Sequence, residues 1–252
     1  MNKTGSTKDA ANNGEVPTGV RSEANARYWI TGAFAAFSLF TVILMIIKGD
    51  YYLVPSALVG MMLSFAPLVI ERLIGGRLNT VMYTVCMFYS IGPMLGDCYK
   101  LYYVVNWFDK TLHFLGGVIF ALLGCFLFEK MSDSARMRSM AAVFAVCFSI
   151  TVACVWEFYE YGMDSLLGID MQHDTVVTEI NSYNLGNEPG VRGEIREIDT
   201  VSVNGAELET GYLDIGLHDT MKDMLLESVG ALGVMAYVIV DRERHPLITD
   251  VI

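Results

Sequence analysis

The sequence is poor in charged residues for its length. Only 18% of its 252 residues are Asp, Glu, Lys or Arg, and 53% are hydrophobic. Soluble domains carry about 25% charged residues. The low charge excludes disorder of the whole chain. Basic residues are the scarcer kind, 17 against 28 acidic ones for a net charge of −11, and this balance excludes a nucleic-acid partner.

The sequence also lacks the short motifs of several common protein classes. Its five cysteines contain no C-x-x-C pair, so no disulfide framework is indicated, and we interpret them as small buried residues. No G-x-x-x-x-G-K, G-x-S-x-G or H-E-x-x-H pattern occurs. NTPase, α/β-hydrolase and zincin activities are therefore without support.

Long uncharged stretches are what the sequence has instead. Six of them have the length that crosses a bilayer, about 20 residues or slightly fewer. The first five contain no charged residue, and the sixth contains one acid, Glu227. This pattern predicts an all-α polytopic membrane protein, a six-helix transmembrane bundle in the lipid bilayer. The predicted spans are 28–47, 51–70, 78–96, 111–128, 139–156 and 224–240.

The distribution of Lys and Arg predicts how the bundle is oriented. Residues 1–27 are rich in Asn, Thr, Ser and Gly, which predicts a disordered tail and not a secretory signal peptide. The side that holds this tail and the C-terminal tail, 241–252, carries 11 Lys and Arg, and the other side carries 6. Positive charge favours the cytoplasmic side, so both termini are expected in the cytoplasm.

The segment between the fifth and sixth spans is polar. Residues 170–218 contain ten acids and two arginines, so most of the negative charge lies on the predicted outer side. Asn204-Gly205, between 193–203 and 206–215, is typical of a β-hairpin with a type I′ turn. The predicted organisation is a tail over 1–27, five helices over 28–164, an acidic extracytoplasmic loop with a β-hairpin over 165–218, a sixth helix over 219–240 and a cytoplasmic tail over 241–252.

Ionisable residues gather at the outer ends of three predicted helices. Within each helix they are spaced three or four residues apart, which places them on one face. The three sets are Asp109 and His113; Glu157, Glu160 and Asp164; and Asp219, Asp223 and Glu227. Because charged groups are costly at membrane depth, we expect these sets to form one functional polar site.

This combination of residue types favours a cation. Carboxylates at close quarters repel one another unless a cation or shared protons intervene. An imidazole with carboxylates suits Zn²⁺, Mn²⁺ or Fe²⁺, and carboxylates alone suit Mg²⁺ or Ca²⁺. Such a cation activates water or polarises a phosphoryl or carbonyl oxygen. The predicted metal ligands are Asp109, His113, Glu157, Asp219 and Asp223, with Glu160 or Glu227 as catalytic general base.

Simpler interpretations of the same residues stay open. Asp109 is also a suitable cap for the fourth helix, and Asp219 with Asp223 for the sixth. Lys110 is also placed to neutralise nearby acids. His113 and Glu227 fit these interpretations less well, because each lies inside an apolar stretch. His173 is interpreted as a solvent-exposed loop residue.

The order of these motifs resembles a family of uncharacterised bacterial inner-membrane proteins. The matching elements are Leu95-Gly96-Asp97, Trp107-Phe108-Asp109-x-x-x-His113, Trp156-Glu157-x-x-Glu160-x-x-x-Asp164, Asp170-Met171-Gln172 and Gly216-Leu217-x-Asp219-Thr220-x-x-Asp223 with Gly230-Ala231. More distantly, residues 78–231 resemble the VanZ-like proteins of teicoplanin and glycopeptide resistance, with their D-K-x-x-H, E-x-x-Q and D-x-x-D elements. Here Glu160 stands in place of the Gln, and Glu227 in place of an amide. The resemblance implies an envelope-associated protein of the bacterial inner membrane.

Three functions are consistent with these features, and the sequence does not decide whether the protein is an enzyme. The first is a metal-assisted hydrolase or transferase that acts on a lipid-linked or cell-envelope substrate. The second is an ion-coupled transporter that relays protons or cations through Asp223 and Glu227, although the polar groups stop at one face of the membrane. The third is a non-catalytic envelope or antibiotic-resistance protein whose acidic loop binds cations, a drug or partner proteins.

Overall fold

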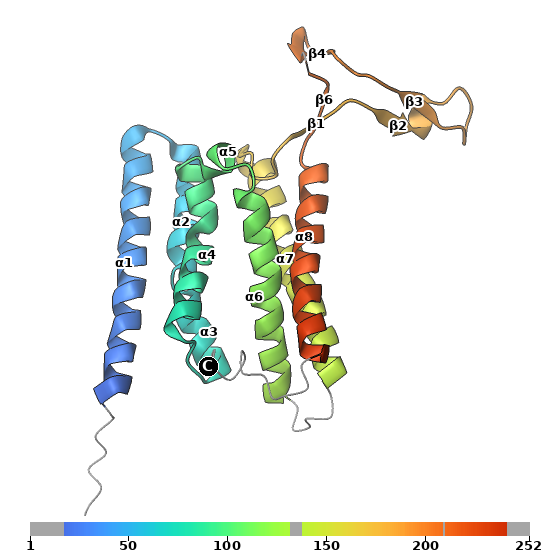
Figure 1. Ribbon diagram of the computed structural model, residues 1–252. Coiled ribbons are helices and arrows are strands. Elements are labelled where there is room, and N and C mark those ends of the chain that lie inside the picture. The colour runs from blue at the N-terminus through green and yellow to red at the C-terminus, as the bar shows by residue number, and fades with distance from the viewer. Residues whose placement is uncertain (1–17, 132–137, 209, 241–252) are drawn as a thin grey trace, which may run out of the picture.

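Long helices dominate residues 18–131, 138–208 and 210–240, which are the residues that the computed structural model describes. They stand side by side, and a strand-containing segment lies beyond one end, here called the strand end (Figure 1). Five described helical segments are long and apolar enough to cross a membrane: Ala26–Lys48, Tyr51–Ile74, Phe108–Met131, Ser139–Leu167 and Leu217–Val240. The prediction of a multi-pass, mainly helical membrane protein is confirmed.

The predicted span 78–96 corresponds to α4 (Thr80–Cys98), which is not among those five segments. Its 19 residues are sufficient in number, but Tyr, Thr and Ser residues together with Pro93 and Asp97 make it less apolar than the others. It nevertheless stands within the row of long helices (Figure 1). The count of six spans therefore stays a prediction.

The first helix is longer than its predicted span. α1 (Thr18–Lys48) begins well before residue 28, so residues 18–27 of the predicted tail are helical. The rest of that tail, 1–17, and the predicted C-terminal tail, 241–252, lie outside the described residues.

The second predicted span, 51–70, is interrupted. It consists of η1 (Tyr51–Leu53), α2 (Val54–Leu63) and α3 (Ala66–Ile74). Pro67 lies in the first turn of α3. A proline has no N–H to bond the carbonyl four residues earlier, here that of Leu63, and its ring clashes with that carbonyl. The helix therefore ends and restarts at this point.

The helices form two groups. In the first group, α1, α2 and α4 enclose a core that includes Val42, Met45 and Met94. In the second group, α6 (Phe108–Met131), α7 (Arg138–Leu167) and α8 (Leu217–Val240) enclose a core rich in small residues. A short helix, α5 (Leu101–Val104), connects the groups, and α4 also packs against α6.

Glycines bring α6 and α8 unusually close together. A Cβ atom at Gly117 would overlap the backbone carbonyl of Glu227, and one at Gly230 would overlap the carbonyl of Phe114. Small residues allow this approach between membrane helices. The close contact places Glu227 directly against α6, beside the residues at the strand end.

A buried ion pair joins α1 to α3, and α3 lies at the end of the bundle away from the strands, here called the opposite end (Figure 1). Nε of Arg27 is 3.4 Å from Oε1 of Glu71, and the Arg27 guanidinium donates to the carbonyl of Leu78. Oε1 of Glu71 accepts from the Leu78 N–H at 2.9 Å. The guanidinium also lies 6.0 Å from the centre of the Tyr83 ring. The positive charge of Arg27 and the negative charge of Glu71 therefore balance each other, and the backbone of Leu78 bonds to both.

The segment between α7 and α8 contains three antiparallel strand pairs. β1 (Thr175–Val177) pairs with β6 (Tyr212–Asp214), β2 (Ile180–Ser182) with β3 (Gly193–Ile195), and β4 (Val201–Val203) with β5 (Ala206–Leu208). Asn204 and Gly205, at the turn between β4 and β5, have φ values of 52° and 83°.

The predicted long strands 193–203 and 206–215 are wrong in extent. Only Val201–Val203 and Ala206–Leu208 pair with each other, in the register Val203↔Ala206. A positive φ of 54° at Glu197 separates β3 from β4, because strand residues require negative φ. The outer parts of both predicted strands pair instead with β2 and β1, which lie earlier in the chain.

Candidate functional site

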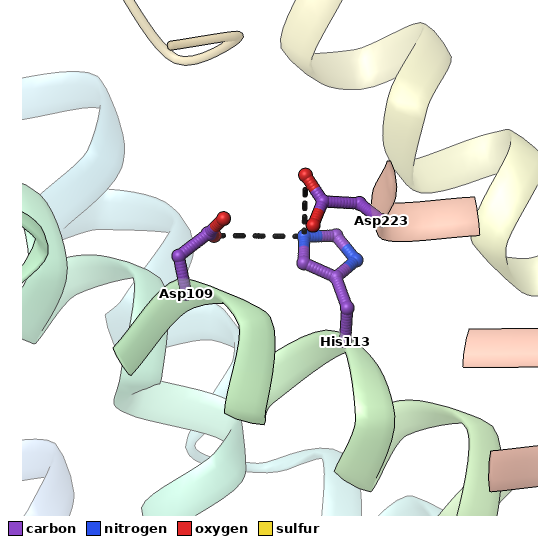
Figure 2. Close-up of side chains that lie close together, drawn as sticks. All are labelled: Asp109, His113 and Asp223. Atoms are coloured by element: carbon purple, nitrogen blue, oxygen red, sulfur yellow. Dashed lines mark ion pairs between the residues drawn. The ribbon is translucent and has the colours of Figure 1, made fainter. Parts of the chain in front are cut away.

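His113 is the centre of the polar site at the strand end. α6 begins at Phe108, so Asp109 and His113 lie on one face of its first turns. Nε2 of His113 is 3.6 Å from Oδ1 of Asp109 and 3.9 Å from Oδ2 of Asp223 on α8. Figure 2 shows both carboxylates directed at this ring nitrogen. Neither distance is a hydrogen bond, which requires about 2.7–3.2 Å.

The other ring nitrogen faces two more carboxylates. Nδ1 of His113 is 4.0 Å from Oε1 of Glu157 on α7 and 3.9 Å from Oε2 of Glu227 on α8. The Ser149 hydroxyl donates to Oε1 of Glu227 at 3.5 Å. Three helices therefore surround one buried imidazole with four carboxylates, and all four belong to the residues predicted from the sequence.

Lys110 binds three aspartates of the site. Its ammonium donates to Oδ2 of Asp109 at 2.8 Å, to Oδ1 of Asp219 at 2.6 Å and to Oδ1 of Asp223 at 2.7 Å. Asp219 therefore lies with Lys110, whereas the predicted ligand set placed it beside His113. Asp219 is one turn nearer the start of α8 than Asp223, and this turn separates it from the imidazole.

Glu157 and Glu160, both on α7, have different surroundings. Oε1 of Glu160 accepts a hydrogen bond from the indole N–H of Trp156 at 2.7 Å. Glu157 is only 5% exposed, and neither of its carboxylate oxygens makes a hydrogen bond of normal geometry with a described residue, although the Thr220 hydroxyl lies near it. A buried polar group without a partner is costly, so this carboxylate is the least satisfied member of the site.

Three sets of ligand atoms lie close enough to share a cation. Within each set, the atoms lie within 4.8 Å of one another. Two ligands at about 2.0–2.1 Å from a tetrahedral Zn²⁺ are about 3.3 Å apart, so modest side-chain movements close these sets around an ion. The sets are His113, Glu157 and Glu160; Asp109, His113 and Asp223; and Asp109, His173 and Asp219.

The site holds more negative than positive charge. Its six carboxylates face one lysine and two histidines, so it stays negative even if both imidazoles are protonated. Such an excess inside a membrane protein favours a bound cation or shared protons. The six carboxylates are Asp109, Glu157, Glu160, Asp219, Asp223 and Glu227.

His173 belongs to this site, and its interpretation as a solvent-exposed residue is wrong. Its backbone N–H donates to Oδ2 of Asp219 at 3.1 Å, and its ring packs edge-on against Tyr102 at 4.8 Å between centres. Burial lowers the pKa of His173, but the Asp219 and Asp109 carboxylates outweigh it, so the pKa lies above the ordinary value. The only hint in the sequence was the motif Asp170-Met171-Gln172, which directly precedes His173.

The segment before His173 is held across the strand end. The Asp164 carboxylate accepts from the backbone N–H groups of Met171 at 2.7 Å and Gln172 at 2.8 Å. The Gln172 amide in turn donates to the Thr220 hydroxyl on α8 at 2.6 Å. Asp164, predicted to share the face of Glu157 and Glu160, therefore fixes the loop that covers the site.

A cavity of about 240 Å³ adjoins the site. Asp109, His113 and Glu227 contribute to its wall, and most of the remaining wall is apolar. The apolar residues come from α2, α3, α4, α6 and α7, so the cavity lies between the two helix groups. The sequence did not predict it, because its walls come from helices whose relative rotation is decided by packing.

Comparison with known proteins identifies a family for almost the whole chain. The model of the family described as predicted membrane protein (DUF2238) matches residues 29–244. No curated protein and no solved structure matches this sequence.

Proposed function

The chain belongs to this family of predicted membrane proteins, and from that premise we propose that it is a metal-assisted hydrolase or transferase. Its substrate is a lipid-linked or cell-envelope molecule, and the reaction takes place at the strand end of the bundle. One observation carries the proposal. The buried Glu157 carboxylate makes no hydrogen bond of normal geometry within the part of the chain that the structure describes, and it lies 4.0 Å from Nδ1 of a histidine that is itself surrounded by carboxylates.

A divalent cation would give the Glu157 carboxylate a partner and would share it with two neighbouring side chains. His113, Glu157 and Glu160 are all buried and offer one nitrogen and two carboxylate oxygens. This donor set is typical of Zn²⁺, Mn²⁺ or Fe²⁺, whereas Mg²⁺ prefers oxygen ligands alone. Glu160 therefore changes from the general base expected from the sequence to a ligand in this proposal.

The remaining residues have supporting roles. Asp109 and Asp223 flank Nε2 of His113 and keep its other nitrogen, Nδ1, directed at Glu157 and Glu227. The Lys110 ammonium neutralises part of the charge on Asp109, Asp219 and Asp223. Outer groups of this kind orient the ligands of catalytic metal sites.

Glu227 is the proposed general base, because it faces His113 and stands outside the ligand set. A cation held by His113, Glu157 and Glu160 would polarise the phosphoryl or carbonyl oxygen of the substrate and make a water more acidic. Glu227 would take the proton of the attacking water while the water oxygen bonds to the phosphoryl or carbonyl centre. The bond to the leaving group breaks, and the leaving group takes the proton from Glu227. In a transferase, an acceptor hydroxyl takes the place of the water.

A transport function receives less support. The charged groups of the site lie at the strand end, and the Arg27–Glu71 pair at the opposite end is enclosed by its own partners. The cavity that adjoins the site is lined mainly by apolar residues. A path for protons or ions requires polar groups across the membrane.

Metal content tests the proposal. The full chain, purified without chelator, is expected to hold a stoichiometric divalent metal by elemental analysis, and Glu157→Gln is expected to bind it at least about tenfold more weakly. His113→Ala is expected to lose it as well. Glu188→Gln makes the same chemical change at an exposed position and is the matched control. A metal-free parent protein, or equal metal in Glu157→Gln and Glu188→Gln, contradicts the proposal.

The proposed location is the bacterial inner membrane, with six spans, both termini in the cytoplasm and the segment 165–218 outside. The excess of Lys and Arg on the side of the termini, 11 against 6, supports this orientation. The order of the motifs also supports a distant VanZ-like relationship and a role in the cell envelope.

Cysteine labelling tests the orientation. Asn204→Cys is expected to react with a membrane-impermeant thiol reagent in intact cells, and Arg77→Cys, in the connection between α3 and α4, only after permeabilisation. The parent chain provides the background from its own cysteines. The reverse pattern would place the site in the cytoplasm.

A further inference from the structure

The cavity beside His113 has the composition of a site for a hydrocarbon chain. Asp109, His113 and Glu227 form its charged wall, four hydroxyl-bearing residues also line it, and most of the rest is apolar, with residues such as Leu63 and Ile119. An apolar cavity of about 150 Å³ stays dry and takes up an apolar guest such as benzene. This larger cavity is therefore suited to apolar contents.

The cavity runs along the helices, away from the site. On α6 its wall extends from His113 to Ile119, a rise of about 9 Å at 1.5 Å for each residue. Its wall also includes Ile70 of α3, the helix that lies at the opposite end (Figure 1). A chain in this cavity lies parallel to the helices, as the chains of bilayer lipids do.

An exposed residue in the cavity wall points to access from the bilayer. The segment held by Asp164 and Gln172 covers the strand end. Val155 on α7 is one of the lining residues and is 62% exposed, so the wall of the cavity reaches the lipid-facing surface of the bundle. A molecule already in the membrane can therefore enter sideways, between the two helix groups.

We propose that this cavity binds one acyl chain of the substrate and holds the lipid head group at His113 and its carboxylates. This inference rests on the proposed function, because it names the substrate of that site as an acyl lipid. The volume also argues for a single chain. Pockets that enclose a whole drug-sized molecule measure roughly 300–1,000 Å³, and this cavity of about 240 Å³ is smaller.

Photolabelling of the full chain tests the proposal. The purified protein is placed in nanodiscs of phosphatidylethanolamine and phosphatidylglycerol that contain phosphatidylglycerol with a diazirine in one acyl chain. After irradiation, labelled peptides are identified by mass spectrometry. A diazirine near the head group is expected to label around Leu112, and one further along the chain around Ile119 and Val152. Labels confined to lipid-facing residues such as Val143, at either diazirine position, overturn the proposal.

A matched pair of variants on α7 adds a second test. Val152→Phe fills part of the cavity, whereas Val143→Phe makes the same change at an exposed position outside it. Labelling inside the cavity is expected to fall roughly tenfold in Val152→Phe, as strain from overpacking implies, and to stay unchanged in Val143→Phe. Equal labelling in the two variants overturns the proposal. If Val152→Phe does not fold, the proposal is tested by whether the two diazirine positions label different depths of the cavity in the parent protein.

Metal content, measured on the same samples, separates the two proposals. Cavity labelling with a stoichiometric metal supports both. A stoichiometric metal without cavity labelling overturns the acyl-chain inference alone. Cavity labelling in a protein that holds no metal overturns the metal-assisted function and supports acyl-chain binding by itself.

Discussion

The two ends of the helix bundle both bury charged side chains, but only one of them balances the charge. At the opposite end, Arg27 and Glu71 form one pair, and the backbone of Leu78 supplies a hydrogen bond to each. At the strand end, six carboxylates face one lysine and two histidines, and Glu157 has no hydrogen-bond partner among the described residues.

This difference separates a structural group from a functional one. Removal of either partner from a buried ion pair leaves an uncompensated charge and destabilises the protein. A buried carboxylate without partners is costly in the folded protein, and proteins keep such groups where a ligand or a reaction uses them. The comparison therefore predicts opposite consequences for similar substitutions at the two ends.

Removal of the cation at the opposite end is expected to have the largest effect. Arg27→Met leaves Glu71 buried without its ion pair and is expected to lower the free energy of unfolding by about 3–5 kcal/mol. Thermal unfolding in detergent measures it, and metal content of the folded fraction is expected to stay at the parent level. Arg72→Met changes an exposed arginine nearby and is expected to shift stability by at most about 0.5 kcal/mol. Equal stability of the two variants would contradict a structural role for Arg27.

The same substitution at both ends gives the most direct comparison. Glu71→Gln is expected to lower stability by about 1.5–3 kcal/mol, because Arg27 loses a charged hydrogen-bonding partner. Glu157→Gln in metal-free protein is expected to leave stability unchanged or raise it by about 1 kcal/mol, since it removes an unpaired buried charge. Unfolding curves recorded in chelator measure both. A loss of stability in Glu157→Gln as large as that in Glu71→Gln would mean that both ends are structural.

Close packing between α6 and α8 is expected to fix the positions of the site residues on these two helices. Gly117→Ala places a methyl group on the Glu227 carbonyl and is expected to lower stability by about 1–3 kcal/mol and to weaken metal binding. A Cβ atom at Gly233 has no neighbour within 4 Å, so Gly233→Ala is expected to be neutral or stabilising by up to about 1 kcal/mol. If the two variants unfold alike and bind metal alike, close packing of α6 against α8 does not determine the geometry of the site.

The smallest expected effect concerns the loop over the strand end. His173→Phe keeps an aromatic ring beside Tyr102 and the backbone N–H that bonds Asp219, but loses the side chain's interaction with that carboxylate. We expect stability to fall by about 1 kcal/mol. His218→Phe, at an exposed position, is the control and is expected to change stability by less than about 0.5 kcal/mol. Equal stability of the two variants would show that the His173 side chain does not interact with the site.

Much of the fold and of the site was predictable from local sequence patterns. The predicted span 111–128 lies within α6, and 139–156 within α7, because the apolar length of a segment is a property of the segment alone. The faces that carry Asp109 with His113, and Asp219 with Asp223, also follow from helical periodicity alone.

Other features could not be predicted in this way. The break before α3 depends on Pro67, which a count of apolar residues ignores. The strand pairs of β1 with β6 and of β2 with β3 join segments distant in the sequence, and a turn signal such as Asn204-Gly205 specifies only the strands next to it. His173 joins the site through the path of its loop, for which the residue itself carries no signal.

The sequence by itself determined that this is a membrane protein with a histidine and several carboxylates at one end of its helices. Only the tertiary structure decided which of these groups are satisfied. Lys110 binds three aspartates, no side chain in residues 18–131, 138–208 or 210–240 makes a hydrogen bond of normal geometry to Glu157, and a mainly apolar cavity lies beside His113. The physical reason is that periodicity assigns a residue to a face of its own helix. How far each helix turns toward its neighbours, and how closely they approach, depends on packing between helices, as at Gly117 and Gly230.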